Sequence, residues 1–199
     1  YFEAKMGGEA VRELLRKLIH YGSSIFPFIY YNFFSRAEML WLLGGLSAIF
    51  LLAEILRMNI SIFKHLFKRF FGPIVRVSES NKFTGATSVF ISGFLTVLIF
   101  EKNIAIFAML TLSLADATAA LIGKKWGKRK LFDKTLEGSL TFLIVSIGLA
   151  IILPDLFRLG AIVAAIVATL IELFPSPIDD NLMIPISIAT TLSLFHLIP

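Results

Sequence analysis

Seven apolar stretches, separated by short polar segments, recur along the whole chain. Most approach the length of about 20 residues that a helix needs to cross a bilayer. Pro27 lies within the first stretch, and Pro154 and Pro175 follow the fifth and sixth, where a helix is expected to end. The pattern predicts an all-α polytopic membrane protein, a single integral-membrane domain over residues 1–199. The expected spans are residues 19–34, 39–56, 83–100, 104–123, 139–153, 156–174 and 182–198.

A different pattern occupies residues 59–71, between the second and third spans. Apolar side chains recur there at helical spacing from Ile62 to Phe71, and basic side chains from Lys64 to Arg69 fall on the other side. This pattern is typical of an amphipathic helix lying in the membrane interface, with its aromatic face toward lipid. The helix is either a topological anchor or part of a route for lipid access, and the pattern leaves both open.

Composition supports a membrane protein and limits its chemistry. The chain of 199 residues is 57% hydrophobic and 17% charged, with a mean hydropathy of +0.83, whereas ordinary soluble domains carry about 25% charged residues. There is no cysteine, which excludes disulfides, thiolate metal sites and cysteine nucleophiles. No nucleic-acid partner is expected, and the oligomeric state is left open.

The positive charges gather on one side of the expected membrane. Four Lys and Arg residues precede the first span, six lie between spans two and three, and six lie in the loop at residues 124–134. The opposite side has only Arg36, Lys102 and Arg158. By the positive-inside rule the N-terminus and the basic loop between spans four and five are cytoplasmic.

Carboxylates in or near the spans need an explanation, because burying them in hydrocarbon is costly. Glu54 has Arg57 three residues later, so a structural ion pair on one helix face is the alternative to a functional role there. By the expected topology all of these acids face the cytoplasm, which argues against a transporter with access from both sides. They are Glu54, Asp116, Glu137, Glu172, Asp179 and Asp180.

Asp116 has a distinctive neighbourhood on its helix. At 100° per residue the small residues Ser113, Ala119, Ala120 and Gly123 fall within about 60° of it, and Gly127 would continue the row. Small residues leave room for a close helix or for a ligand against the backbone. Ordinary small-residue packing of membrane helices explains the alanine and glycine residues but not the acid.

The loop that follows brings cations and carboxylates together. Six cations between Lys124 and Lys134 precede the segment Lys-Thr-Leu-Glu-Gly-Ser at residues 134–139, in which Ser139 is the expected N-cap of the next helix. Binding of anionic lipid would explain the cations alone. Flanking acids, Asp116 before and Glu137 after, favour a polyphosphate with a divalent cation. No Walker motif, protein-kinase motif or dinucleotide-binding glycine motif occurs.

These motifs carry a family resemblance. Asp-x-x-Ala-x-x-x-Gly-x-x-x-Gly from Asp116 to Gly127, followed by Lys-Thr-x-Glu-Gly-Ser from Lys134 to Ser139, resembles the CTP-dependent lipid kinases, a family of dolichol, phytol and diacylglycerol kinases. The resemblance runs from about residue 16 to the end of the chain. Weaker matches are Arg16, Lys17 and His20; Glu54 and Arg57; Arg76 and Glu79 with the Thr-Gly-Ala-Thr of residues 84–87; and Glu172 with Asp180 and Asn181.

The resemblance implies transfer of the γ-phosphate of CTP to the hydroxyl of a polyprenol or another isoprenoid alcohol, at the cytoplasmic membrane face. It implies Asp116, Glu137 and Asp180 as catalytic residues, and these three with Asn181 as ligands of Mg²⁺ or another divalent cation. It implies nucleotide binding by the following residues: Gly123, Lys124, Lys125, Gly127, Lys128, Lys134, Thr135, Gly138 and Ser139.

Three other functions compete with the kinase. A CTP:lipid cytidylyltransferase shares the nucleotide, the metal and the membrane but transfers CMP. An ion-coupled transporter predicts polar groups that reach the far side of the membrane. A lipid-binding scaffold without turnover leaves the pairing of Asp116 with Glu137 unexplained.

Overall fold

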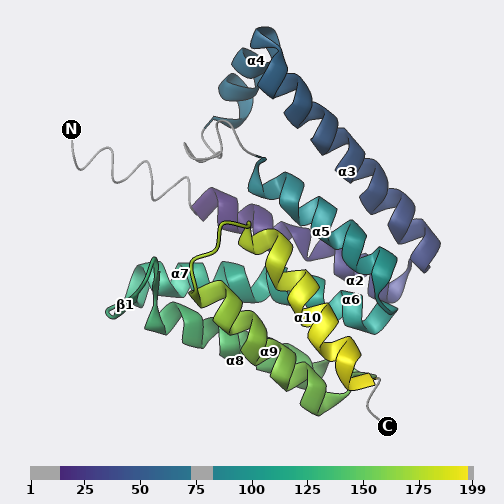
Figure 1. The fold of residues 1–199 in the computed structure, drawn as a ribbon, viewed down its shortest axis with the longest axis vertical. Helices are drawn as coiled ribbons and strands as arrows, with labels where there is room; N and C mark the ends of the chain where they lie inside the picture. Colours follow the sequence, from purple (N-terminus) through teal and green to yellow (C-terminus); the bar gives the residue numbers. More distant parts are fainter. Residues whose placement is uncertain (1–13, 73–82, 197–199) are drawn as a thin grey trace.

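The protein is mostly helical in the computed structural model, which describes residues 14–72 and 83–196 (Figure 1). Residues 14–23 are helical, and a short antiparallel hairpin pairs β1 (Lys130–Leu131) with β2 (Lys134–Thr135). The further elements are α2 (Ile25–Asn32), α3 (Arg36–Asn59), α4 (Ser61–Phe71), α5 (Gly85–Ile99), α6 (Lys102–Leu110), the π-helix η2 (Thr111–Asp116), α7 (Ala117–Trp126), α8 (Leu136–Ile152), α9 (Arg158–Leu173) and α10 (Asp180–His196).

Each of the seven apolar stretches contains a helix, and the expected interfacial segment forms α4. Two helices in the described ranges are long and apolar enough to cross a membrane, α3 and the continuous helix Lys102–Trp126. The helices α5, α8 and α10 are apolar but shorter. The all-α architecture is confirmed, with one small exception, since the basic loop contains the β1–β2 hairpin. The number of membrane crossings and their direction stay predictions.

The two long helices differ in their surroundings. In the Lys102–Trp126 helix 72% of the most apolar stretch is buried inside the protein, against 17% for α3. Figure 1 shows α3 and α4 projecting from the other helices, with α5 beside α3. Trp41 on α3 is 84% exposed. A long helix with an apolar and unpacked surface fits contact with lipid better than contact with water.

Two hydrophobic clusters meet at the Lys102–Trp126 helix. One joins its side chains to α8, α9 and α10, around Phe107, Phe142 and Ile188. The other joins α6 to α2, α3 and α5, around Tyr30 and Leu43. Because this helix packs on both sides, it fixes the position of every residue that it carries, including Asp116.

Three cationic side chains cap the C-terminal ends of helices on one side of the molecule. Arg36 donates hydrogen bonds from Nε to the Val97 carbonyl, at 3.1 Å, and from Nη2 to the Leu98 carbonyl, at 2.6 Å. Lys102 donates to the carbonyl of Phe34, just beyond α2, at 2.9 Å. Arg158 donates to carbonyls at the end of α8. These are the same three cations that the charge pattern assigns to the face opposite the basic loop. Each satisfies carbonyls left free at a helix end and interacts favourably with the helix dipole.

Glycine allows α7 and α8 to approach closely. A Cβ atom on Gly123 would lie 2.6 Å from the Thr135 hydroxyl and 3.3 Å from the Gly138 Cα. A Cβ atom on Gly138 would lie 3.1 Å from the Ala119 carbonyl oxygen. The small residues that the sequence places beside Asp116 therefore serve close helix packing, and they also bring the start of α8 next to α7.

Candidate active site

A cavity of about 500 Å³ lies where α7, the hairpin and the α9–α10 connection meet. Figure 1 shows the hairpin, the C-terminal end of α9 and the α9–α10 connection at the same end of the molecule. The volume falls within the usual range for small-molecule sites. Its charged lining residues come from four separate parts of the chain: Lys17, Asp116, Lys124, Asp133, Lys134, Glu172 and Asp180.

Asp116 reaches this cavity while remaining only 6% exposed. Lys17 Nζ donates a hydrogen bond to Asp116 Oδ2 at 2.6 Å, and both side chains are buried. His20 Nδ1 lies 3.8 Å from the same oxygen and has no hydrogen-bond partner within the described ranges. Two members of the Arg16-Lys17-x-x-His20 motif are thus brought to Asp116, although about a hundred residues separate them in sequence.

Hydroxyl contacts fasten the first helix along the helix that carries Asp116. The Tyr21 hydroxyl lies 2.6 Å from Thr118 Oγ1, and Ser23 Oγ lies 3.0 Å from Ser113 Oγ. These contacts bracket Asp116 on both sides, so Lys17 is held against it by a fixed helix pair.

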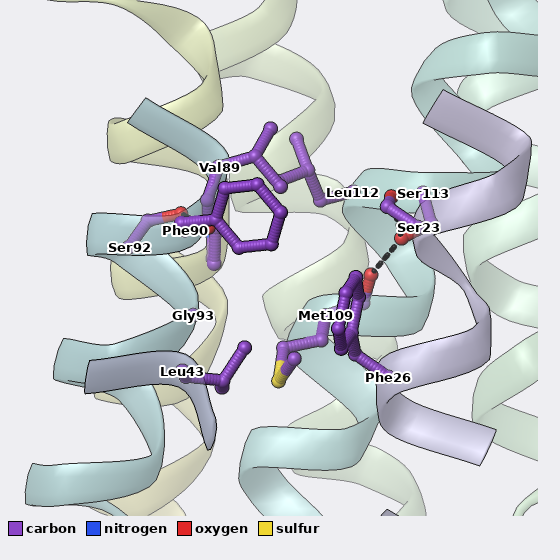
Figure 2. Close-up of a pocket in the computed structure, with 11 residues that line it drawn as sticks. Ser23, Phe26, Leu43, Val89, Phe90, Ser92, Gly93, Met109, Leu112 and Ser113 are labelled. Atoms are coloured by element: carbon purple, nitrogen blue, oxygen red, sulfur yellow. Dashed lines mark hydrogen bonds between the residues drawn. The ribbon is translucent and has the colours of Figure 1, made fainter. Parts of the chain in front are cut away.

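The expected face around Asp116 is confirmed except at Ser113 and at Gly127, which ends α7 and does not line the cavity. Asp116, Ala119, Ala120 and Gly123 all line the cavity. Ser113 instead lines a second, apolar cavity of about 10 Å³, where Figure 2 shows Phe90 of α5 opposite Phe26 and Met109. The cause is η2, because a π-helix has i→i+5 hydrogen bonds and wider turns, so the 100° rule fails there. The second cavity has room for about one water molecule and is too small for a lipid chain.

Lys134 joins two acids from the far end of the chain. Its Nζ donates to Glu172 Oε1 at 2.8 Å and to Asp180 Oδ2 at 3.2 Å. Burial lowers the pKa of Lys134, but the negative charges of Glu172, Asp180 and Asp116 outweigh this, and the pKa lies above its ordinary value of 10.5. Lys134 therefore carries its charge throughout the physiological pH range.

Thr135, and not Ser139, is the N-cap of α8, which corrects the expectation. The Thr135 side chain accepts a hydrogen bond from the Gly138 N–H at 3.2 Å. The helix begins at Leu136, so Ser139 lies within it, and its hydroxyl donates to Glu172 Oε2 at 3.1 Å. Threonine and serine are both good N-caps, and the extended backbone at Thr135 decides between them.

Several expected site residues lie apart from the cavity lining. The Glu137 carboxylate accepts a hydrogen bond from the backbone N–H of Arg129 at 3.3 Å. Lys125 lies over the Trp126 ring, and the backbone N–H of Asn181 donates to Asp179. A metal or nucleotide role stays a prediction for each residue of this group: Lys125, Gly127, Lys128, Glu137, Ser139 and Asn181.

The Glu54–Arg57 ion pair is confirmed and belongs to a separate network. Glu54 is 2% exposed and accepts hydrogen bonds from Arg57 Nε at 2.8 Å, from the Thr84 backbone N–H at 2.8 Å and from Thr87 Oγ1 at 3.1 Å. Arg57 also lies over the Phe67 ring of α4. This network ties α3 to the start of α5 and to α4. The expected motif residues Arg76 and Glu79 lie outside the described residues.

The donor chemistry near Lys134 suits a divalent cation bound together with a polyphosphate. Mg²⁺ in nucleotide enzymes is commonly held by one or two carboxylates plus substrate phosphates. Glu172 and Asp180 share one ammonium group, so a cation already sits between their oxygens. Among the residues that the structure describes, no three His, Asp or Glu side chains form a metal site by themselves.

The chain is similar to the uncharacterized protein RP860 of Rickettsia prowazekii. The two are 32% identical over 195 residues, which cover 92% of this chain and 94% of that protein. This chain belongs to the RP860 family. No family model matches it, and no solved structure does.

This chain is also homologous to two CTP-dependent diacylglycerol kinases. It is 33% identical over 110 residues to CTP-dependent diacylglycerol kinase 1 of Schizosaccharomyces pombe. This match covers 54% of the chain and 50% of the kinase. It is 24% identical over 139 residues to the Saccharomyces cerevisiae protein of the same name, covering 68% of the chain. The matched region spans about half of each kinase. This homology supports the resemblance to CTP-dependent lipid kinases and leaves the choice of lipid alcohol untested.

Sequence reasoning missed two features of the cavity. It did not single out Asp133, and it did not pair Glu172 and Asp180 with Lys134. Asp133 lies within the two-residue turn between β1 and β2, and because Asp is common in turns its residue type gives no functional signal. No sequence signal shows that α9 ends beside the hairpin.

Proposed function

We propose that this chain is an integral-membrane, CTP-dependent lipid kinase. It transfers the γ-phosphate of CTP to the hydroxyl of a membrane lipid alcohol. A polyprenol or another isoprenoid alcohol is the acceptor that the family resemblance implies, and diacylglycerol is the acceptor that the names of the two homologous kinases give. The active site faces the cytoplasm, below seven membrane-spanning helices.

One observation carries the proposal. The cavity of about 500 Å³ unites Lys17, Lys124 and Lys134 with Asp116, Glu172 and Asp180, and Asp116 belongs to the apolar, buried helix Lys102–Trp126. Cations suit phosphate oxygens, and a carboxylate carried within an apolar helix suits a hydroxyl that arrives from the membrane. In the described ranges Lys124 has no ion-pair partner, so it is available to a phosphate.

The reaction requires little covalent chemistry from the protein. The lipid hydroxyl oxygen attacks the γ-phosphorus, the bond between that phosphorus and the β–γ bridging oxygen breaks, CDP leaves, and the hydroxyl proton passes to Asp116 Oδ. Lys17 holds Asp116 in place through the 2.6 Å hydrogen bond. Lys124 and Lys134 neutralise the phosphates, and Thr135 and Gly138 position the start of α8 beside them.

A divalent cation would be held by Glu172 and Asp180, with Asp116 as a further carboxylate in the same cavity. When bound, it would neutralise charge on the nucleotide phosphates. Lys134 would then exchange its two carboxylates for phosphate oxygens.

The test supplies purified protein in lipid–detergent micelles with CTP labelled at the α or at the γ phosphate. The acceptors are dolichol, geranylgeraniol, phytol, undecaprenol and diacylglycerol, each assayed separately. We expect γ-label, and no α-label, to enter at least one lipid. Incorporation of α-label would show a cytidylyltransferase. Incorporation of neither label into any of the five would contradict the kinase and favour a transporter or a scaffold.

A further inference from the structure

The tip of the hairpin places an aromatic ring beside the cavity. Phe132 lies in the two-residue turn between β1 and β2, and its ring centroid is 5.3 Å from that of Phe174, at an interplanar angle of 51°. Phe174 follows α9 and lines the cavity. The two rings are 60% and 52% exposed. Together they form an aromatic surface at the margin of a cavity that contains three lysines.

The backbone at Phe132 is strained. Its φ is 54°, in the left-handed region that glycine, asparagine and aspartate tolerate and that bulky side chains rarely adopt. The turn would form more easily with asparagine or glycine at this position. The exposed ring also gains little from burial, so folding alone does not account for a phenylalanine here. Strained residues of this kind cluster at ligand sites, where the surrounding structure holds them.

Asp133, the next residue, lines the same cavity. Its carboxylate has no hydrogen-bond or ion-pair partner among the described residues, despite the lysine-rich loop around it. A carboxylate is a pure acceptor. Cytosine presents an amino group, which donates, at the position where uracil presents a carbonyl oxygen, which accepts, and Asp or Glu commonly accepts from this amino group.

We propose that Phe132 and Phe174 form the stacking surface for the nucleobase, and that Asp133 accepts a hydrogen bond from the cytosine amino group. The turn would thereby select CTP over UTP, while Lys124 and Lys134 bind the phosphates within the same cavity. This inference rests on the proposed function and adds the nucleobase subsite to it. Stacking on an aromatic ring typically changes affinity by about fivefold to 100-fold.

The test measures equilibrium binding of CTP, UTP and inorganic tripolyphosphate to the full-length protein in detergent. The Phe132→Asn variant removes the ring and relaxes the turn. We expect it to bind CTP about tenfold more weakly, to bind tripolyphosphate as the wild type does, and to melt at the same temperature or higher. Loss of CTP affinity in a protein that is no less stable is a result that misfolding does not produce.

Two further variants sharpen the test. Asp133→Asn should reduce the preference for CTP over UTP by about tenfold, because an amide can donate to the uracil carbonyl. Trp126→Ala is the matched control, since this exposed aromatic residue does not line the cavity, and its CTP affinity should not change.

The outcomes separate the two proposals. A wild type that binds no CTP would overturn the proposed function and the nucleobase subsite together. A wild type that binds CTP, combined with equal losses of CTP and tripolyphosphate in Phe132→Asn, or with no loss, would overturn only the stacking surface. An unchanged CTP-to-UTP ratio in Asp133→Asn would overturn the role of Asp133.

Discussion

Two buried carboxylates, Glu54 and Asp116, both pair with a cation, but their surroundings differ. Glu54 receives hydrogen bonds from Arg57, Thr84 and Thr87 and lines neither cavity described above. Asp116 has Lys17 as its close partner, with the unpartnered Nδ1 of His20 nearby, and it lines the large cavity. Glu54 therefore has the surroundings of a structural ion pair, whereas Asp116 borders a cavity in which a ligand could meet it, as the proposed function requires.

The largest expected effect is a loss of activity that distinguishes Asp116 from Glu54. Asp116→Asn should lower lipid phosphorylation by about 100-fold or more, because the amide cannot accept the hydroxyl proton, while the shape of the side chain is kept. The measurement is transfer of γ-label from CTP, with helix content followed by circular dichroism. Activity within a few-fold of wild type in a folded Asp116→Asn protein would remove the proposed difference between the acids.

Glu54→Gln should lower the stability of the protein and leave its activity nearly unchanged. Removing one partner of a buried ion pair leaves an uncompensated charge and costs about 3 kcal/mol or more of unfolding free energy. We expect a lower melting temperature in detergent, with the turnover of the protein that remains folded close to wild type. A loss of turnover without a loss of stability would place Glu54 in the reaction instead.

Gly138→Ala tests how closely α7 and α8 must approach at the site. The added methyl would lie 3.0 Å from the Thr135 hydroxyl and 3.1 Å from the Ala119 carbonyl, so we expect a loss of about 1–3 kcal/mol in thermal unfolding. Gly148→Ala on the same helix is the matched control. A Cβ there meets nothing within 4 Å, and alanine should leave stability unchanged or raise it by up to about 1 kcal/mol. Equal effects of the two changes would contradict the close-packing interpretation.

The smallest expected effect concerns Lys134. Lys134→Gln should raise the KM for CTP by about tenfold, as expected for loss of one charge-assisted contact. Lys130→Gln, in the same hairpin but outside the cavity lining, should change it little.

The pH dependence of the Lys134 contact follows from its raised pKa. The stabilisation from its ion pairs is fully present below pH 10.5 and is lost only as the pH rises through the higher pKa of the folded state. The difference in KM between wild type and Lys134→Gln should therefore be constant between pH 6 and pH 9. A difference that disappears within this range would show that the contact depends on another titrating group.

How much the sequence predicts depends on whether the contacts are local. The Glu54–Arg57 pair follows from a spacing of three residues, and the helices follow from apolar runs. The face of Asp116, Ala119 and Gly123 follows from helical periodicity. The contact of Lys17 with Asp116 and the gathering of Glu172 and Asp180 around Lys134 depend on how distant helices pack, which periodicity does not encode. Ser139 was misplaced because two good capping residues lie four positions apart.

The π-helix that ends at Asp116 changes how the region responds to the deletion of a residue. A π turn holds one residue more than an α turn, so deletion of a single residue within Thr111–Asp116 would let an ordinary α-helix form across the segment. Because the π turn already holds that extra residue, the flanking helices α6 and α7 would keep nearly the same relative orientation, and Asp116 would stay beside Lys17. The same deletion within α7, an ordinary α-helix, would rotate the residues on one side of it by about 100°. The helix can therefore lose one residue between Thr111 and Ala115 without disconnecting the two halves of the site, whereas a one-residue gap in α7 would disconnect them.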